Sequence, residues 1–267
     1  MTASGDTFER ARSEGRAVLV GYLPAGFPSY DGCIDTLRAM VDAGVDVVEL
    51  GLPYSDPVID GPTIQAAAEL ALRNGTRTRD VLRTVEAVAA TGAPVLVMTY
   101  WNPVLRYGVE EFARDLAAAG GAGLITPDLI PDEAGEWVGA ADAHALERVF
   151  LVAPSSTPAR IASTVDACRG WVYATSTMGV TGARDATSAL APALVERVRA
   201  STSLPVGVGL GVSNGAQAAE IASYADGVIV GSAFVRRLLD APDGAAGEKA
   251  VAALAADLAE GVRRKGS

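Results

Sequence analysis

Short hydrophobic runs alternate along the chain with longer segments in which hydrophobic residues recur every three or four positions. The short runs are almost continuously apolar, a pattern typical of parallel β-strands that are covered on both faces. Eight such runs are present: AVLVGYL (17–23), VDVVELG (45–51), PVLVMTY (94–100), GAGLITP (121–127), RVFLVAP (148–154), WVYATS (171–176), LPVGVGLG (204–211) and DGVIVGSA (226–233). We therefore predict eight parallel strands.

The segments between these runs have the helical period, and CIDTLRAMVDAG (33–44) and DVLRTVEAVAATG (80–92) both end in glycine, a common helix C-cap. Strands that alternate with helices over this length predict an α/β fold, a single (β/α)8 TIM barrel. The rival is a doubly wound open sheet. It is disfavoured because no G-x-G-x-x-G follows the first run and the alternation continues to the end. No linker divides the chain, so residues 1–267 are predicted to form one domain.

The second run leads into a long excursion, GLPYSDPVIDGPTIQ (51–65). Pro62 suits the first turn of a helix, and the segment after it has helical period up to Gly75, which suits the position after a helix end. We therefore predict an extra helix after strand 2. The long loop before that helix is a candidate functional segment, because long barrel loops usually carry function.

Composition narrows the classes of partner and compartment. The formal net charge of −10 disfavours nucleic acid or an anionic membrane as a partner. The only cysteines, Cys33 and Cys168, fall in segments with an amphipathic helical pattern and are read as core residues. The N-terminus lacks the apolar region of a signal peptide, and no apolar run is long enough to cross a bilayer. A cytoplasmic protein is expected.

Histidine and lysine are scarce at the positions where catalysis would need them. His144 is the only histidine and lies in a polar helical segment, so it is read as a surface residue. The only lysines, Lys249 and Lys265, are near the C-terminus. These positions argue against a histidine base, a histidine-rich metal site and a Schiff-base lysine. We predict no metal and no organic cofactor.

Two carboxylates stand where a barrel keeps its active site, at and beyond the carboxyl ends of the strands. Glu49 follows the apolar residues of the second run, where burial should raise its pKa and suit it to donate and accept a proton. The alternative is a carboxylate that only hydrogen-bonds neighbouring strand ends. Asp60 lies in the long loop and could instead cap the extra helix, as Asp56 before Pro57 could be a turn residue.

Glycines gather at the ends of the last two runs. Gly209, Gly211, Gly231 and Ser232 could present backbone N–H groups to an anion, with Ser232 at the start of a short helix after strand 8. Barrels often bind phosphate at this place. The alternative is that the glycines only permit tight turns. We predict a short phosphate-binding helix after strand 8.

The polar loop TSTMGVTGARDATSAL (175–190) follows strand 6 and is either a lid over the barrel mouth or a plain connection. Together, these features predict a small phosphorylated substrate and carboxylate acid–base chemistry. An isomerase, a lyase and an aldolase without a Schiff base all fit that description.

Several blocks make the chain resemble the tryptophan synthase alpha subunit family along essentially its whole length. They are VELGLPYSDPVIDGPTIQ, MTYWNPVLRYG, PDLIPDE, FLVAPSST, MGVTGAR, GVGLGVS and DGVIVGSA, in the order of the family. The resemblance implies retro-aldol cleavage of indole-3-glycerol phosphate to indole and glyceraldehyde 3-phosphate. It makes Glu49 the catalytic acid–base and Asp60 the acceptor of the indole N–H.

The resemblance also assigns a set of substrate-binding positions. Some line the indole pocket and others bind the phosphate, with a lid threonine that meets Asp60 on closure. The set is Tyr22, Ile64, Met98, Tyr100, Ile125, Val152, Tyr173, Thr181, Gly182, Gly211, Gly231 and Ser232. The chain departs from the family pattern at Ile59, Trp101, Ile130 and Leu210, which bear on loop closure, pocket shape or subunit contacts.

Finally, the resemblance implies a partner, a beta subunit in an α2β2 assembly that receives indole through a tunnel. Pyridoxal phosphate would belong to that partner. The surface near it would include Asp56, Pro57, Asn102 and Pro103. Two other functions stay open: another phosphosugar enzyme of aromatic amino-acid synthesis, such as an isomerase, and a non-catalytic subunit that only activates its partner. A stand-alone lyase that releases free indole is a further variant.

Overall fold

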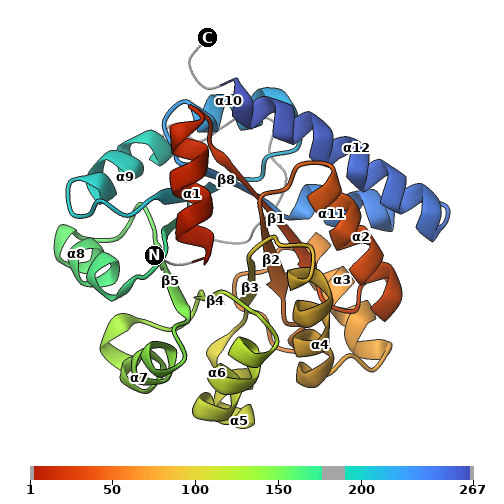
Figure 1. Cartoon of the computed structure of the whole chain (residues 1–267), viewed down its shortest axis with the longest axis horizontal. Helices are drawn as coiled ribbons and strands as arrows, with labels where there is room; N and C mark the ends of the chain where they lie inside the picture. The colour runs from red at the N-terminus through yellow and green to blue at the C-terminus, as the bar shows by residue number, and fades with distance from the viewer. Residues whose placement is uncertain (1–2, 176–189, 265–267) are drawn as a thin grey trace.

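A computed structural model describes residues 3–175 and 190–264. In this part of the chain the strands form one closed parallel barrel in sequence order, with β1 paired to β8 (Figure 1). The predicted (β/α)8 barrel fold is confirmed. The strands are β1 (Val18–Pro24), β2 (Val47–Gly51), β3 (Val95–Met98), β4 (Gly123–Thr126), β5 (Glu147–Val152), β6 (Val172–Thr175), β7 (Val206–Gly209) and β8 (Gly227–Val230).

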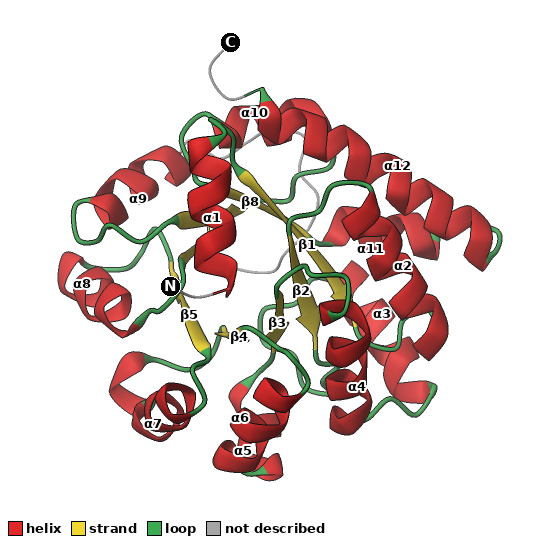
Figure 2. Cartoon of the chain, in the orientation of Figure 1, coloured by secondary structure: helices red, strands yellow, loops and turns green. Residues whose placement is uncertain are grey.

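Helices surround the barrel as an outer layer (Figure 2). The extra helix predicted after strand 2 is present as α3, which has Pro62 at its first position and Gly75 in a left-handed conformation (φ 86°) after its end. The helix predicted after strand 8 is present as α11. The helices are α1 (Ala3–Ser13), α2 (Tyr30–Asp42), α3 (Pro62–Arg73), α4 (Thr78–Ala89), α5 (Trp101–Tyr107), α6 (Val109–Ala118), η1 (Pro131–Glu133), α7 (Gly135–Ala143), α8 (Pro158–Ala167), α9 (Leu190–Arg199), α10 (Gly215–Ala222), α11 (Ser232–Leu239) and α12 (Gly244–Arg263).

The core has two layers because successive strand residues point to opposite faces. One cluster fills the barrel and includes Val47 of β2 and Ile125 of β4. The larger cluster lies between the barrel and the helices and includes Val48 and Leu50. Glu49 therefore points inward, since it is two residues from Val47. Strand alternation thus places this carboxylate inside the barrel.

Helix α1 is an element that the hydrophobic pattern did not predict. Its Phe8 is buried in the inner cluster with its ring centroid 5.7 Å from that of Trp171. The backbone N–H of Ser4 donates to the buried carboxylate of Glu147 at 2.7 Å. Glu147 begins β5, so α1 covers the amino-terminal end of the barrel, opposite the strand ends that carry the candidate site.

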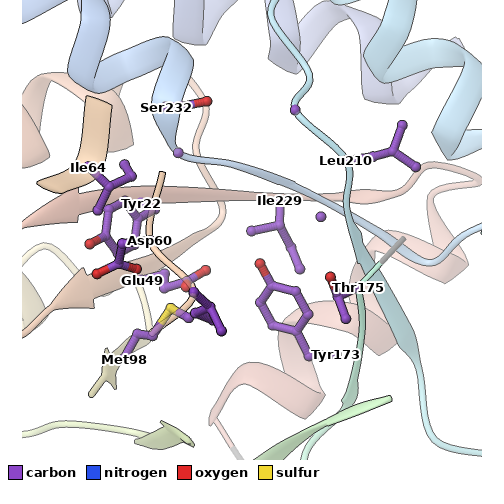
Figure 3. Close-up of a pocket in the computed structure, with 14 residues that line it drawn as sticks. Tyr22, Glu49, Asp60, Ile64, Met98, Tyr173, Thr175, Leu210, Ile229 and Ser232 are labelled. Atoms are coloured by element: carbon purple, nitrogen blue, oxygen red, sulfur yellow. The ribbon is translucent and has the colours of Figure 1, made fainter. Parts of the chain in front are cut away.

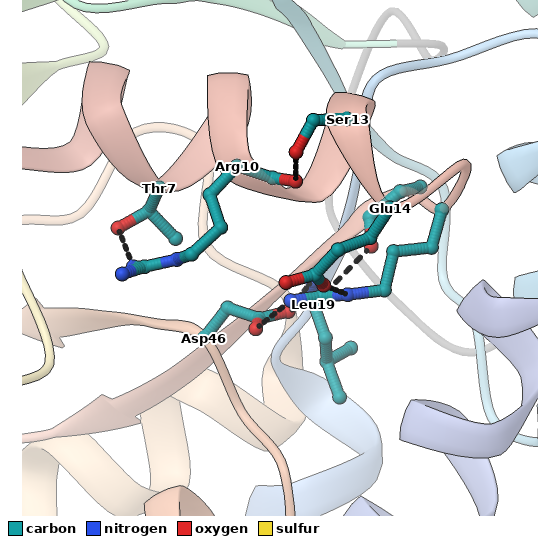
Figure 4. Close-up of polar contacts among 8 residues, drawn as sticks. Thr7, Arg10, Ser13, Glu14, Leu19 and Asp46 are labelled. Atoms are coloured by element: carbon teal, nitrogen blue, oxygen red, sulfur yellow. Dashed lines mark hydrogen bonds and ion pairs between the residues drawn. The ribbon is translucent and has the colours of Figure 1, made fainter.

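An ion pair fixes the segment between α1 and β1 (Figure 4). The Arg16 guanidinium contacts the Asp46 carboxylate at 2.8 Å, and the backbone N–H of Leu19 donates to the same carboxylate at 2.9 Å. Asp46 directly precedes β2, so this network joins the start of β2 to β1. The network therefore fixes the amino end of β2, the strand that carries Glu49.

The two cysteines lie in the core, as predicted, whereas the histidine predicted to lie at the surface is half-buried. Cys33 is buried within α2, and Cys168 is buried directly after α8 as its C-cap; both are free thiols. His144 is the C-cap residue of α7, and its Nε2 atom lies 2.7 Å from the Glu110 carboxylate. Among the helices of residues 3–175 and 190–264, none is long and apolar enough to cross a membrane.

Candidate active site

A pocket opens at the carboxyl ends of the strands, and both predicted catalytic carboxylates line it (Figure 3). Side chains from β1, β2, β3, β6 and β8 meet there with loop 2, which we define as residues 52–61 between β2 and α3. The lining residues are Tyr22, Glu49, Ile59, Asp60, Ile64, Met98, Tyr173, Thr175, Gly209, Leu210, Gly211, Ile229, Gly231 and Ser232.

Glu49 is held inside the barrel with few polar partners. It pairs in register with Tyr22 on β1, and only 1% of its surface is exposed. Its Oε2 atom has no hydrogen-bond partner among the described residues. Burial, with a smaller contribution from the charge of Asp60, raises the pKa of Glu49 to about 8. The carboxyl group is therefore largely protonated near neutral pH, unlike a structural carboxylate with all its oxygens hydrogen-bonded.

Asp60 does not cap α3. The N-cap residue of that helix is Gly61, which makes no side-chain capping bond. Burial raises the pKa of the Asp60 carboxyl above its usual value, and a hydrogen bond from Tyr100 opposes this rise. The aspartate is thus a partly buried second carboxylate, which lines the pocket on the same side as Glu49 (Figure 3).

The segment of loop 2 before Asp60 is attached to the end of β3. The backbone N–H groups of Val58 and Ile59 donate to the hydroxyl oxygen of Tyr100 at 3.1 and 3.0 Å. Tyr100 does not itself line the pocket. The Tyr100 hydroxyl is therefore held beside loop 2.

The opposite wall of the pocket is built from the ends of β7 and β8. Gly211 has a φ of +69°, a left-handed conformation that other residues adopt only with strain. Gly231 is the N-cap of α11 and makes no side-chain capping bond, and Ser232 is the first residue of that helix. The first N–H groups of a helix carry a partial positive charge. An anion is therefore suited to the space between Gly211 and Ser232.

Most of the predicted substrate-binding positions lie on the pocket. Those that line it are Tyr22, Ile64, Met98, Tyr173, Gly211, Gly231 and Ser232. Ile125 lies beneath it in the inner cluster. Thr181 and Gly182 lie outside the described residues.

Val152 requires a correction. It belongs to the cluster between the barrel and the helices, whereas Leu151 packs in the inner cluster with Met98 and Tyr173. Adjacent strand residues point to opposite faces, so a shift of one position moves a side chain out of the barrel. Leu151 replaces Val152 as the β5 residue beside the pocket.

Two further lining residues were not identified from the sequence. Ile229 lies two positions before Gly231, and Thr175 lies two positions after Tyr173. Alternation along β6 and β8 was the signal that would have found both, because residues two apart share a face. Ile59 and Leu210, noted as departures from the family pattern, also line the pocket.

The residues predicted to face a partner are on the rim of the same barrel end. Asp56 and Asn102 are exposed, and Pro57 and Pro103 are half-buried. Asn102 donates from Nδ2 to the Tyr54 hydroxyl at 3.0 Å, which links α5 to loop 2.

A family model for tryptophan synthase alpha chains matches residues 8–263. The chain belongs to the tryptophan synthase alpha chain family. It is 65% identical over 263 residues to the alpha chain of Salinispora tropica, covering 98% of each chain. It is 65% identical over 260 residues to that of Nocardia farcinica, covering 97% of this chain and 95% of the other. A solved structure of Mycobacterium tuberculosis tryptophan synthase matches with a TM-score of 0.92 and 58% identity, covering 97% and 98% of the two chains.

Membership of this family establishes a lyase of tryptophan biosynthesis. Tryptophan synthase alpha chains have no cofactor of their own, and the family implies a beta-subunit partner. The pocket described above is therefore the candidate active site of a tryptophan synthase alpha chain.

Proposed function

We propose that this pocket cleaves indole-3-glycerol phosphate to indole and glyceraldehyde 3-phosphate, with Glu49 as the acid–base and Asp60 as the partner of the indole N–H. The observation that carries the proposal is the pair of carboxylates in one pocket. Glu49 is buried with a pKa of about 8, and Asp60 lines the same pocket from loop 2. Two carboxylates whose environments differ can take different roles in one reaction.

A single carboxyl group can both donate and accept the proton that this reaction transfers. The protonated Glu49 carboxyl donates to carbon 3 of the indole ring, which leaves a positively charged ring. The bond between that carbon and the glycerol chain then breaks, and its electron pair restores the neutral indole. The hydroxyl on the adjacent chain carbon becomes the aldehyde and releases its proton, which returns to the Glu49 carboxylate.

Asp60 stabilises the charged intermediate of this sequence. Protonation of the ring carbon makes the ring N–H a stronger donor, and a carboxylate that accepts from it counters the developing charge. The ring itself accepts the electrons of the broken bond, so the step needs no Schiff base. This fits the sequence, in which the only lysines are at positions 249 and 265, after the last predicted strand.

The phosphate of the substrate is assigned to the wall made by Gly211, Gly231 and Ser232. The positive end of α11, the left-handed turn at Gly211 and the Ser232 hydroxyl support this assignment. Gly182, which the resemblance adds to the group, is part of the same proposal.

Ser232→Asp should raise KM for indole-3-glycerol phosphate by about 100-fold, because it places a negative charge beside a dianionic group. An acidic residue at a helix N-terminus does not disfavour the helix, so the melting temperature should stay close to that of the parent chain. Steady-state kinetics and a thermal melt measure the two quantities.

The matched control is Ser163→Asp, which adds the same charge on α8. It should leave KM unchanged. Equal KM values for Ser232→Asp and the parent chain would place the phosphate elsewhere.

The partner surface is assigned to the rim of the pocket, at Asp56, Pro57, Asn102 and Pro103. Exposed hydrophobic side chains nearby support it, since Val58 is 75% exposed, Leu105 50% and Ile130 40%. A beta subunit docked there would receive indole through a tunnel from the pocket, in an α2β2 assembly that holds pyridoxal phosphate in the beta subunit. We also propose that residues 1–267 form one domain and that the enzyme works in the cytoplasm.

Asp56→Arg should weaken association with a tryptophan synthase beta chain by at least about tenfold while leaving the indole release of the isolated chain within twofold of the parent. Reversing a rim charge disturbs the contact, whereas Asp56 does not line the pocket. Titration calorimetry measures the association. Glu86→Arg, a charge reversal on α4, is the control. Unchanged affinity in Asp56→Arg would move the interface away from loop 2.

The experiment that tests the proposed function is a substrate panel. The purified chain, alone and with a beta chain, is assayed for indole release from indole-3-glycerol phosphate and for turnover of a phosphorylated ribosyl anthranilate. Indole release is expected from the first substrate and no turnover of the second. Isomerisation of the second would favour the alternative enzyme, and stimulation of the beta chain without any indole release would favour a non-catalytic subunit.

A further inference from the structure

The hydroxyl of Tyr100 is surrounded by loop 2, although Tyr100 stands just beyond the end of β3. The backbone N–H groups of Val58 and Ile59 both donate to its oxygen. The Asp60 carboxylate also interacts with this hydroxyl: its charge raises the pKa of the phenol, and the phenol lowers the pKa of the carboxyl. One phenol oxygen therefore binds two consecutive residues of loop 2 and interacts with the next residue, the proposed catalytic Asp60.

The direction of the phenol proton follows from these contacts. A phenol oxygen has two lone pairs for accepting and one proton for donating. An amide N–H can only donate, so Val58 and Ile59 occupy the accepting positions. The proton is left for Asp60, which accepts it most strongly as a carboxylate, because a charge-assisted bond is roughly twice as strong as a neutral one. The arrangement therefore favours the ionised form of Asp60.

Tyr100 is itself fixed by the barrel. Only 5% of its surface is exposed, and its ring centroid is 5.4 Å from that of Tyr54. The Tyr54 hydroxyl accepts from Asn102 at the start of α5. The hydroxyl that binds loop 2 therefore has a rigid base at the end of β3.

We propose that Tyr100 is a positioning residue, which attaches loop 2 to the barrel and thereby holds the Asp60 carboxylate at the pocket. The family pattern suggested a substrate-binding residue instead, but Tyr100 does not line the pocket. This inference rests on the role proposed for Asp60. Among the described residues, the other titratable groups that interact with Asp60 are Glu49 and Tyr22, and both are kept in the variants below.

The test is Tyr100→Phe, which removes one oxygen and keeps the ring. We expect kcat/KM to fall by about 10- to 50-fold, mostly through kcat, since the charge on Asp60 matters most when the ring is protonated. The acidic limb of the pH profile should move to higher pH, because Asp60 loses the donor that favours its ionised form. A lower kcat with no movement of the acidic limb would mean that the Tyr100 hydroxyl has only a structural role, and it would overturn the proposal.

Tyr107→Phe is the matched control. Its hydroxyl donates to the Asp115 carboxylate at 2.7 Å, so the substitution also removes a phenol–carboxylate bond, but outside the pocket. Activity and pH profile should both match the parent chain.

A double-mutant cycle with Asp60→Asn separates the possible outcomes. If Tyr100 acts through Asp60, Tyr100→Phe should have less than about a threefold effect in the Asp60→Asn background. If the two effects multiply, Tyr100 contacts the substrate directly and the proposal is wrong. Affinity for an unreactive indole-3-alkyl phosphate gives the same comparison where turnover is too slow to measure. Near-normal activity of Asp60→Asn alone would overturn the proposed function, whereas a slow Asp60→Asn with a normal Tyr100→Phe would overturn only this inference.

Discussion

Glu49→Gln is expected to lower kcat for indole release by about a thousandfold or more, the largest effect of any single substitution in this chain. Glutamine keeps the size of the side chain but cannot transfer a proton, and general acid–base catalysis supplies about 10²- to 10⁴-fold in enzymes. Here the same group serves as acid and base, so both transfers are lost. Stopped or continuous assays of indole release measure the effect, and a kcat within tenfold of the parent would remove Glu49 from the mechanism.

Glu49→Gln also has an internal control, because the substitution should raise the stability of the fold at alkaline pH while it lowers activity. The pKa of Glu49 is about 8 in the folded chain, against an ordinary value of 4.5. Stability contributed by the protonated group is therefore complete below pH 4.5 and is lost as the pH rises through 8. Glutamine is neutral throughout. The free energy of unfolding of Glu49→Gln should exceed that of the parent by roughly 5 kcal/mol at pH 9 and match it near pH 4, as measured by urea titration.

Asp60→Asn should lower kcat by about 10²- to 10³-fold, the second largest effect. The substitution removes the charge that counters the protonated indole ring, and a preorganised group of this kind is worth about 3 to 4 kcal/mol. The assay is again indole release from indole-3-glycerol phosphate. Asp56→Asn, an exposed aspartate of the same loop, is the control and should remain near the parent rate.

The pH profile gives a second test of Asp60. In the parent chain, kcat/KM should fall on the acidic side as Asp60 is protonated, above the ordinary range of an aspartate, and on the alkaline side near pH 8 as Glu49 ionises. The charge of Asp60 contributes to the raised pKa of Glu49. In Asp60→Asn the alkaline limb should therefore move to lower pH. An unmoved limb would mean that the two carboxylates do not interact.

Strand positions were predicted closely because burial on two faces leaves a local signal. All eight strands fall within their predicted runs, except that β1 ends and β5 begins one residue outside. Helix α1 was missed because its role depends on the barrel. Phe8 becomes buried only because the folded barrel brings Trp171 against it at the amino-terminal end.

The two carboxylates show how much of the site could be predicted from the sequence. The position of Glu49 after an apolar run indicated a buried acid, and the structure adds that one of its oxygens lacks a partner among the described residues. Asp60 had two local interpretations, a helix cap and a site residue. Only the observed cap at Gly61 and the contact with Tyr100 separate them.

The sequence by itself determined the barrel, the order of its strands and the residue types that gather at their carboxyl ends, because periodicity and turn residues act over a few positions. The tertiary structure decided which of those residues share a pocket. It exchanged Val152 for Leu151, since the face of a strand residue depends on parity within a closed sheet. It also placed the Tyr100 hydroxyl against loop 2, because contacts between residues 58 and 100 arise only when neighbouring strand ends meet.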